Sequence, residues 1–310
     1  MRNILLIGRT NWLLDSAKLI HQEGFNIVGI ITSRESSESK VTVETLKSYA
    51  EEIDTTFIYA PKLTKDLFYK NFANIDLHIG ISVNYTGIIS KEIIELFEYG
   101  VLNAHGGDLP RYRGNACQAW ALINAEEHIG LCIHKMIGGE LDSGKIISRR
   151  YYPVNINTRI GQVYDFFDEN IPTLFLESLR KLANDKSYFL EEQSKDKKDI
   201  LRCYPRLPED GRIIWDKSNA EIIRLVNATS EPYSGAFCFF NGVKFHVWRA
   251  SLFDDGIDFL GIPGQVAKIL TTGQIIVLTG KGKIIIEEVG YDGFNGKPAN
   301  IIKSLRSRLS

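Results

Sequence analysis

The chain has 310 residues, of which 44% are hydrophobic and 24% are charged, so it is long enough for two globular domains. Its 37 Lys and Arg against 38 Asp and Glu give a formal net charge of −1, which argues against a protein that grips nucleic acid mainly through phosphates. No apolar run reaches the roughly 18 residues of a membrane span, and the four scattered cysteines form no zinc or disulfide pattern, so we expect a cytoplasmic protein without a metal.

The first part of the chain alternates short apolar strands with helical segments. The opening segment leads directly into Gly8 and reads as a buried strand, because no small-residue cleavage site of a signal peptide follows it. This alternation predicts an open, Rossmann-like parallel sheet with helices on both faces, which binds ligands at the carboxyl ends of its strands. Strands are expected at residues 3–7, 25–32, 56–59, 77–83 and 100–103, and helices at 12–23, 43–52, 65–72 and 91–97.

A second stretch continues this pattern and ends in a linker. Residues 117–124 are predicted as a helix, and 131–136 and 145–152 as strands. Residues 158–186 have an amphipathic helical pattern, which we expect to break near Pro172 because proline lacks the amide hydrogen. Residues 195–201 are dense in charge and poor in large apolar side chains, which is typical of a linker.

After residue 206 the pattern changes from alternating strands and helices to a series of short strands. Asn241-Gly242 is a hairpin signal between the apolar and aromatic segments 234–240 and 243–250, and further strands are expected at 263–270, 274–279 and 283–289. Short strands at such regular spacing predict a smaller β-barrel-like (OB-like) domain. We therefore expect a catalytic domain at 1–194, a linker at 195–206 and a β-rich domain at 207–310.

The strongest chemical pattern follows the strand expected at 100–103. Asn103 and His105 lie two positions apart on extended chain, so both side chains project to the same side. Gly106-Gly107 allows a close approach of the backbone, and a second glycine-rich loop carries Asp142. Each residue also has an ordinary structural explanation: a histidine packed after a strand, an asparagine that caps a loop, an aspartate in a turn.

These motifs resemble the formyltransferase family that uses formyl-tetrahydrofolate. The resemblance rests on Asn103-Ala104-His105 with Leu109-Pro110-Arg111-Tyr112-Arg113-Gly114, and on Leu141-Asp142-Ser143-Gly144. It continues through residues 83–90 and into the second domain, at residues 207–215 and 232–237. Together these segments span nearly the whole chain.

The resemblance implies a transfer of the formyl group of 10-formyltetrahydrofolate to a substrate amine, without a metal. His105 would accept the proton of the amine, Asp142 would orient His105 and favour its charged form, and Asn103 would donate to the developing oxyanion. In relatives, two loops hold the pterin largely through backbone groups. The matching folate-binding positions here are Tyr85, Thr86, Gly87, Ile88, Ile89, Gly138, Gly139 and Glu140. For Ile88 and Ile89, simple core packing is the alternative.

The acceptor separates three groups of relatives. Glycinamide ribonucleotide formyltransferases match only the first domain. Methionyl-tRNA formyltransferases usually carry a basic, Lys- and Gly-rich loop after the second strand, whereas residues 33–40 here have mixed charge. They also usually have Ser and Leu where this chain has Gly107 and Asp108, and Ala-Ala-Pro at 115–117. These departures favour the N-formyltransferases of dTDP- or UDP-linked amino-dideoxy sugars, which serve bacterial surface glycans such as the O-antigen of lipopolysaccharide.

For this acceptor, the expected substrate contacts are Arg9, Thr10, Asn11, Trp12, Gly107 and Asp108. A helix N-terminus beside Arg9 would favour a diphosphate, and Trp12 could stack on a base or simply begin the helix core. The rivals are a methionyl-tRNA formyltransferase, a formyl-folate hydrolase and a binding module without activity. Analogy with sugar-type relatives suggests a homodimer, with no nucleic-acid or membrane partner.

Overall fold

The computed structural model describes residues 3–35 and 39–310, which fall into two compact units. The first unit contains the described residues up to 117 together with 129–152 and 164–204, and the second contains 118–128, 153–163 and 205–310. The units follow packing rather than position along the chain, since two internal segments join the C-terminal part. The domain limits at 1–194, 195–206 and 207–310 therefore stay a prediction.

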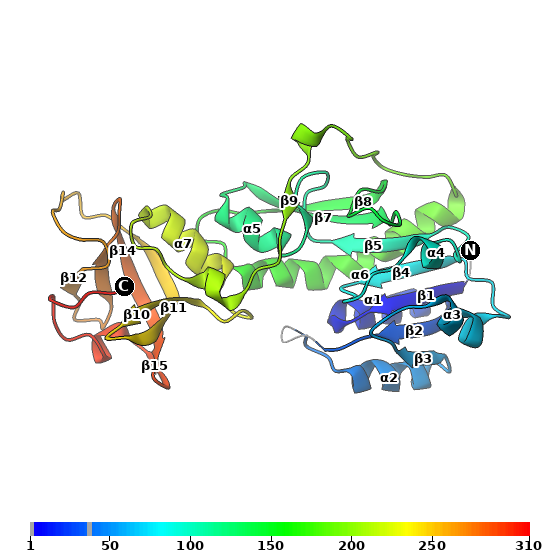
Figure 1. The fold of residues 1–310 in the computed structure, drawn as a ribbon, viewed down its shortest axis with the longest axis horizontal. Helices are drawn as coiled ribbons and strands as arrows, with labels where there is room; N and C mark the ends of the chain where they lie inside the picture. Colours follow the sequence, from blue (N-terminus) through cyan, green and yellow to red (C-terminus); the bar gives the residue numbers. More distant parts are fainter. Residues whose placement is uncertain (1–2, 36–38) are drawn as a thin grey trace. The chain divides into compact units, whose positions relative to one another are not determined.

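The described part of the first unit is built on a seven-stranded sheet in the order β3-β2-β1-β4-β5-β7-β8 (Figure 1). The first five strands of this order run parallel, which confirms the predicted parallel sheet, whereas β7 joins β5 antiparallel. The strands are β1 (Asn3–Gly8), β2 (Asn26–Thr32), β3 (Thr56–Tyr59), β4 (Ile79–Val83), β5 (Val101–His105), β7 (His128–Lys135) and β8 (Ile146–Pro153). The first helices are α1 (Thr10–Gln22), α2 (Val43–Glu52), α3 (Lys65–Phe72) and α4 (Lys91–Ile94).

Helices cover both faces of this sheet because the strands are apolar on both sides. Leu5 and Ile7 of β1 pack in one cluster with residues of α3 and α4, such as Phe68 and Ile93. The alternate residues Ile4 and Leu6 are equally buried and project to the opposite face. The sheet order reverses between β1 and β4, so the carboxyl ends of these two strands form the crevice that doubly wound sheets use for ligands.

Two expectations about helices in this part of the chain are wrong. Helix α4 stops at Ile94, three residues before its predicted end at residue 97. Helix α6 (Ile160–Asn184) runs through Pro172 without the predicted break. The side chains of Ile171 and Phe175 beside the proline are buried, so the packing of this face offsets the roughly 3 kcal/mol that an interior proline costs.

The expected linker is paired with the chain near the sheet rather than extended on its own. A short 3₁₀ turn, η1 (Lys197–Asp199), precedes β9 (Arg202–Cys203), which pairs parallel with β6 (Arg113–Gly114). The Arg113 amide also donates to the Leu201 carbonyl at 2.9 Å. The residues after α6 therefore hold the loop that follows β5.

The second unit is a smaller antiparallel sheet, as predicted, in the order β10-β11-β14-β13-β12 with β15 on β14. Its strands are β10 (Ala236–Phe240), β11 (Val243–Phe253), β12 (Val266–Ile269), β13 (Ile275–Leu278), β14 (Lys283–Tyr291) and β15 (Phe294–Gly296), and the unit also contains most of α5 (Cys117–Ile123), η2 (Pro208–Gly211), α7 (Asn219–Ala228) and η3 (Pro298–Asn300). The predicted hairpin is confirmed, because Asn241 and Gly242 both have positive φ.

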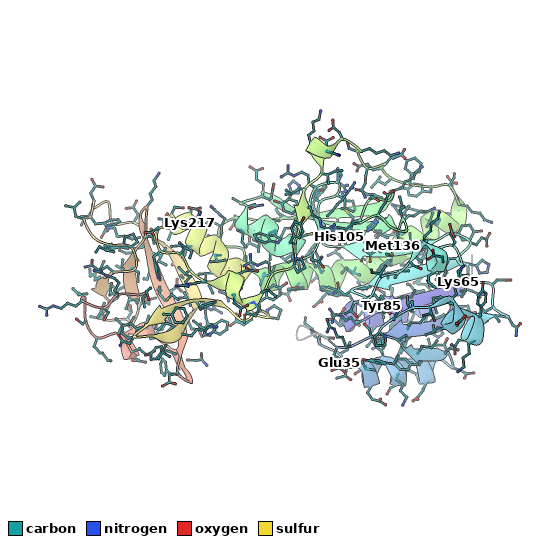
Figure 2. The ribbon with its side chains drawn as sticks, in the orientation of Figure 1. Glu35, Lys65, Tyr85, His105, Met136 and Lys217 are labelled. Atoms are coloured by element: carbon teal, nitrogen blue, oxygen red, sulfur yellow. The ribbon has the colours of Figure 1, made fainter. Side chains whose placement is uncertain are left out.

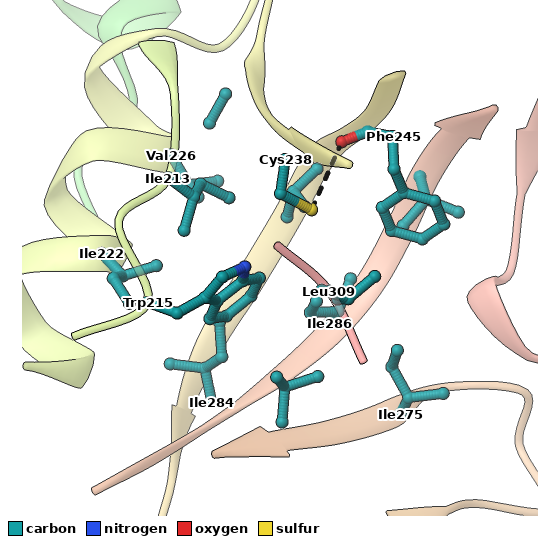
Figure 3. Packing of buried hydrophobic residues seen from close by; sticks show 14 of the residues in the cluster. Ile213, Trp215, Ile222, Val226, Cys238, Phe245, Ile275, Ile284, Ile286 and Leu309 are labelled. Atoms are coloured by element: carbon teal, nitrogen blue, oxygen red, sulfur yellow. Dashed lines mark hydrogen bonds between the residues drawn. The ribbon is translucent and has the colours of Figure 1, made fainter. Parts of the chain in front are cut away.

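The C-terminal residues close this sheet between its two edge strands. Ser310 exchanges two backbone hydrogen bonds with Phe239 of β10, and the Val266 amide of β12 donates to the Ser307 carbonyl. The Leu309 side chain enters the apolar core between Trp215 and Ile286 (Figure 3). Such closure protects edge strands from unwanted pairing.

Among the described residues, no helix is long and apolar enough to cross a membrane, and no three His, Cys, Asp or Glu side chains gather as a metal site.

Replacing Leu309 by alanine should destabilise the protein, because the Leu309 side chain is 1% exposed. We expect a loss of about 2–5 kcal/mol in the free energy of unfolding, measured by denaturant titration. Leu305→Ala is the matched control, since Leu305 is 51% exposed and should change stability little. Equal effects of the two substitutions would contradict the closure by Leu309.

Candidate functional site

The structure brings Asn103, His105 and Asp142 together at the carboxyl edge of the first sheet. Asn103 and His105 are on β5, and Asp142 lies in the loop between β7 and β8. The His105 Nδ1 atom is 3.5 Å from Asp142 Oδ2, and both side chains are largely buried. Figure 2 labels His105 within the first unit. His105 and Asp142 are therefore in contact although they lie nearly forty residues apart in the sequence. The roles of the three residues stay predictions.

One nitrogen of His105 is already occupied. Its Nε2 lies 2.6 Å from the carbonyl oxygen of Tyr112, and because a carbonyl only accepts, Nε2 carries the hydrogen. The nitrogen that can accept a proton is then Nδ1, which faces Asp142. At 3.5 Å this pair is longer than a charge-assisted hydrogen bond, which is about 2.7–2.9 Å. A proton that reaches this site would be shared by the imidazole and the carboxylate.

Burial and neighbouring charges set the pKa values of this pair. Burial lowers the pKa of His105 below its ordinary 6.5, against the opposing effect of the Asp142 carboxylate. Burial alone would raise the pKa of Asp142, but His105, His134 and the Gly114 amide at 2.9 Å together lower it below its usual range. At neutral pH the resting pair is therefore a neutral imidazole beside a carboxylate, which is the state that can take up a proton.

His134 is a fourth polar residue of the site, which the sequence analysis missed. It lies directly opposite Asn103 in the antiparallel pairing of β5 and β7. His134 Nδ1 donates to the Lys135 carbonyl at 3.0 Å, so Nε2 can accept the Asn103 amide at 3.3 Å. His134 Nε2 is also 3.5 Å from Asp142 Oδ1. This contact fixes the direction of the Asn103 NH2 group, whose second hydrogen can be directed to a ligand.

Gly107 and Asp108, both expected to contact the substrate, have structural partners. A Cβ atom on Gly107 would stand 2.7 Å from His105 Nε2, so any side chain would displace the imidazole. The Asp108 carboxylate receives a 2.9 Å hydrogen bond from the Arg149 guanidinium, which also donates to the Leu109 carbonyl at 2.6 Å. These contacts give both residues a structural role that needs no substrate. The presence of Gly107 and Asp108 therefore no longer favours a sugar acceptor over a tRNA acceptor.

The first candidate folate loop is held to the sheet by its polar side chains. The Tyr85 hydroxyl donates to the Ala60 carbonyl at 2.6 Å, and burial raises the pKa of Tyr85 to about 12, which keeps it a neutral donor. The Thr86 and Ser33 hydroxyls are 2.8 Å apart. Gly87 lies against the Tyr85 ring, where a Cβ atom would be at 2.7 Å. These contacts hold the loop in one conformation against the sheet.

Ile88 and Ile89 have different environments. Ile89 is 6% exposed and belongs to the apolar core, whereas Ile88 is 86% exposed. Gly138 of the second loop packs on the backbone of Lys91, the first residue of α4, two residues after the first loop ends at Ile89. In the second loop, Gly139 has positive φ and the exposed Glu140 accepts from Ser143. The second loop therefore lies close to the end of the first, and the folate contacts of both loops stay a prediction.

The predicted nucleotide contacts at the first strand–helix turn divide into two pairs. Arg9 lies in the crevice between β1 and β4, where its Nε donates to the Asn84 carbonyl at 2.9 Å. Thr10 has a φ of 78°, and within the described residues its buried hydroxyl has no hydrogen-bond partner. Asn11 and Trp12 instead donate to the carboxylate of Asp168 on α6, at 2.8 and 2.5 Å.

The Trp12 side chain is 9% exposed and stacks on Tyr164, with ring centroids 5.5 Å apart. This placement agrees with the alternative that Trp12 begins the helix core. The same Asp168 carboxylate forms an ion pair with Lys40.

Two models of known protein families match this chain. A model of formyl transferases matches residues 2–179, and a model of the formyl transferase C-terminal domain matches residues 207–303. The chain belongs to the formyl transferase family. This confirms the resemblance from which the donor was predicted.

Relatives of this formyl transferase include enzymes of different names. The methionyl-tRNA formyltransferase of Ruminiclostridium cellulolyticum is 27% identical over 93% of this chain and 92% of its own. The N-formyltransferase of Helicobacter canadensis, solved with folinic acid and dTDP-3-aminofucose, is 19% identical with a TM-score of 0.69 over 92% and 99% of the two chains. HypX of Aquifex aeolicus, solved with tetrahydrofolic acid, has a TM-score of 0.61 at 18% identity over 98% of this chain. This chain spans about half the length of HypX, 47%.

The titration of His105 should report its contact with Asp142. We expect the His105 imidazole to titrate below 6.5 in the native protein, because burial disfavours its charged form. The carboxylate raises the pKa of His105, so Asp142→Asn should lower it further. NMR spectroscopy of histidine-labelled protein measures both values, with His105→Gln to assign the signal among the six histidines. A higher pKa in Asp142→Asn would contradict this electrostatic arrangement.

Proposed function

We propose that this formyl transferase moves the formyl group of 10-formyltetrahydrofolate to the amine of a dTDP- or UDP-linked amino-dideoxy sugar. The observation that carries the reaction type is the convergence of Asn103, His105 and Asp142 at the carboxyl edge of the sheet. An amide donor, an imidazole and an ionised carboxylate are the groups that an acyl transfer to an amine needs.

In this proposal the amine attacks the formyl carbon as the free base. The Asn103 NH2 group, oriented by His134, donates to the formyl oxygen as that oxygen becomes negative. The proton of the amine passes to the His105–Asp142 pair, which starts neutral at His105 and ionised at Asp142. The tetrahydrofolate nitrogen leaves and takes up a proton. No covalent bond to the protein is required.

The two neighbouring loops support the donor site. The backbone of residues 85–89 and 138–140 would hold the pterin, and Ile88 would cover one of its faces. Solved relatives contain tetrahydrofolic acid or a formyl-tetrahydrofolate, which agrees with this choice of donor.

Two observations support a sugar acceptor: the mixed charge of residues 33–40 and the position of Arg9. Residues 33–40 contain two cations and two anions rather than a basic cluster, and one of the cations, Lys40, is paired with Asp168. Arg9 in the β1–β4 crevice is the candidate contact for a diphosphate. Asn11 and Trp12 would act indirectly by fixing α1 through Asp168. Two solved relatives crystallised with dTDP or a dTDP-amino sugar agree with this choice.

The alternative is a methionyl-tRNA formyltransferase, and the names of two relatives at 27% and 24% identity favour it. A role in bacterial surface glycans and a homodimer follow from the sugar proposal by analogy, and the cysteine pattern adds the proposal of a cytoplasmic location.

A formylation assay decides between the acceptors. The protein is incubated with 10-formyltetrahydrofolate and a panel of dTDP-, UDP- and GDP-linked 3- and 4-amino sugars, with methionyl-tRNA in parallel. We expect a sugar product heavier by one formyl group and no product with the tRNA. Product on methionyl-tRNA alone would replace the sugar proposal by the alternative.

With the accepted amine, His105→Ala and Asn103→Ala test the chemistry. Each should lower kcat by about 10²–10³-fold, since each removes a group that acts in the transition state. Asn103→Ala should affect kcat more than the affinity for the donor. Ser178→Ala, at a buried site on α6 hydrogen-bonded to Ser148, is the control and should retain activity. Activity of His105→Ala near that of the native protein would remove His105 from the mechanism.

A further inference from the structure

The segment between α6 and β9 places one buried amide directly on the loop that carries Asp142. Gln193 is 5% exposed, and its side-chain NH2 group donates to the carbonyls of Asp142 and Gly144, at 2.8 and 2.7 Å. Its oxygen accepts from Nε and Nη2 of Arg113, at 3.2 and 2.7 Å. The orientation of the amide is unambiguous, because the two carbonyls can only accept and the guanidinium can only donate.

One of these contacts holds the main chain of Asp142 itself, and a second holds Gly144 two residues further on. Asp142 has a φ of 47°, a left-handed conformation that non-glycine residues adopt at a cost. Its carboxylate is held by the amide of Gly114, the neighbour of Arg113 in β6. Strand β6 thus holds Asp142 twice, through a backbone amide on the carboxylate and through Arg113 and Gln193 on the main chain.

The intermediate amide has a chemical advantage over a direct ion pair. If Arg113 bound the Asp142 carboxylate directly, it would compete with His105 for the same oxygens and lower the basicity of the pair. Because Gln193 connects the Arg113 guanidinium to the Asp142 carbonyl, the guanidinium does not bind the carboxylate, which contacts the Gly114 amide and the two imidazoles.

We propose that Gln193, anchored by Arg113, is a positioning residue that keeps the Asp142 carboxylate in register with His105. Its catalytic consequence rests on the proposed formyl transfer, whereas its effect on His105 does not. The groups that face His105 are Asp142 from its loop, His134 from β7 and Arg113 from β6. Among these, the carboxylate favours the charged imidazole, while His134 and Arg113 oppose it.

The test is the pKa of His105 in Gln193→Met, measured by NMR without any substrate. Methionine has nearly the volume of glutamine and lacks its donors, so Asp142 should move away from His105. We expect the His105 pKa to fall toward that of Asp142→Asn, by on the order of 0.5 pH unit. Arg113→Lys keeps the positive charge but loses the paired donors, and should shift the pKa in the same direction.

Ser178→Ala is the matched control, because it removes a buried hydrogen bond of the same unit far along α6. It should lower stability and leave the His105 pKa unchanged. An unchanged pKa in Gln193→Met, or an equal shift in Ser178→Ala, overturns the proposal. Arg113→Lys gives the same decision if Gln193→Met does not fold.

With an accepted amine in hand, Gln193→Met should also lower kcat by about 10–100-fold at an unchanged KM for that amine. A rise in that KM with kcat unchanged would contradict a positioning role. If no tested amine is formylated, the proposed function is at fault, and the His105 titration still decides the role of Gln193.

Discussion

A carboxylate buried between two imidazoles, as Asp142 is between His105 and His134, costs free energy unless its oxygens and its backbone find partners. In this formyl transferase those partners come from four separate segments: β5, β6, β7 and the chain after α6. The site is therefore a property of the whole unit rather than of one motif. It also explains why the chain after α6 returns to the sheet edge and pairs with β6 before it continues to the second unit.

Much of the first sheet and the meeting of Asn103, His105 and Asp142 could be predicted from the sequence. Apolar strands separated by amphipathic helices leave little choice of architecture, and the carboxyl ends of the parallel strands, where Asn103 and His105 lie, share one edge. Asp142 follows the antiparallel strand β7, so its meeting with His105 is predicted by the family motifs rather than by the sheet. A helix with a clear start signal is predictable: α2 begins at Val43, directly after Thr42, whose side chain caps the Thr45 amide. The same logic applied to Ser218 and Glu221, a complete capping box, would have found helix α7.

Contacts between side chains that lie far apart along the chain could not be predicted from the sequence. His134 looks like any polar residue in a strand until the antiparallel register sets it opposite Asn103. Gln193 lies in a segment whose composition indicates a linker, and only the pairing with β6 brings it to the Asp142 loop. Asn11 and Trp12 suggested a ligand because their partner, Asp168, is more than 150 residues away. Pro172 failed as a helix breaker because local propensity yields to burial.

The pairing of His134 with Asn103 also limits how such a chain can change in evolution. Side chains alternate along a strand, so inserting or deleting one residue between Ile129 and His134 would turn the imidazole to the far face of the sheet. The turn before β7 can gain or lose residues without this effect. Natural variation in length should therefore gather in that turn, and an engineer who grafts a new loop should cut there and leave β7 intact.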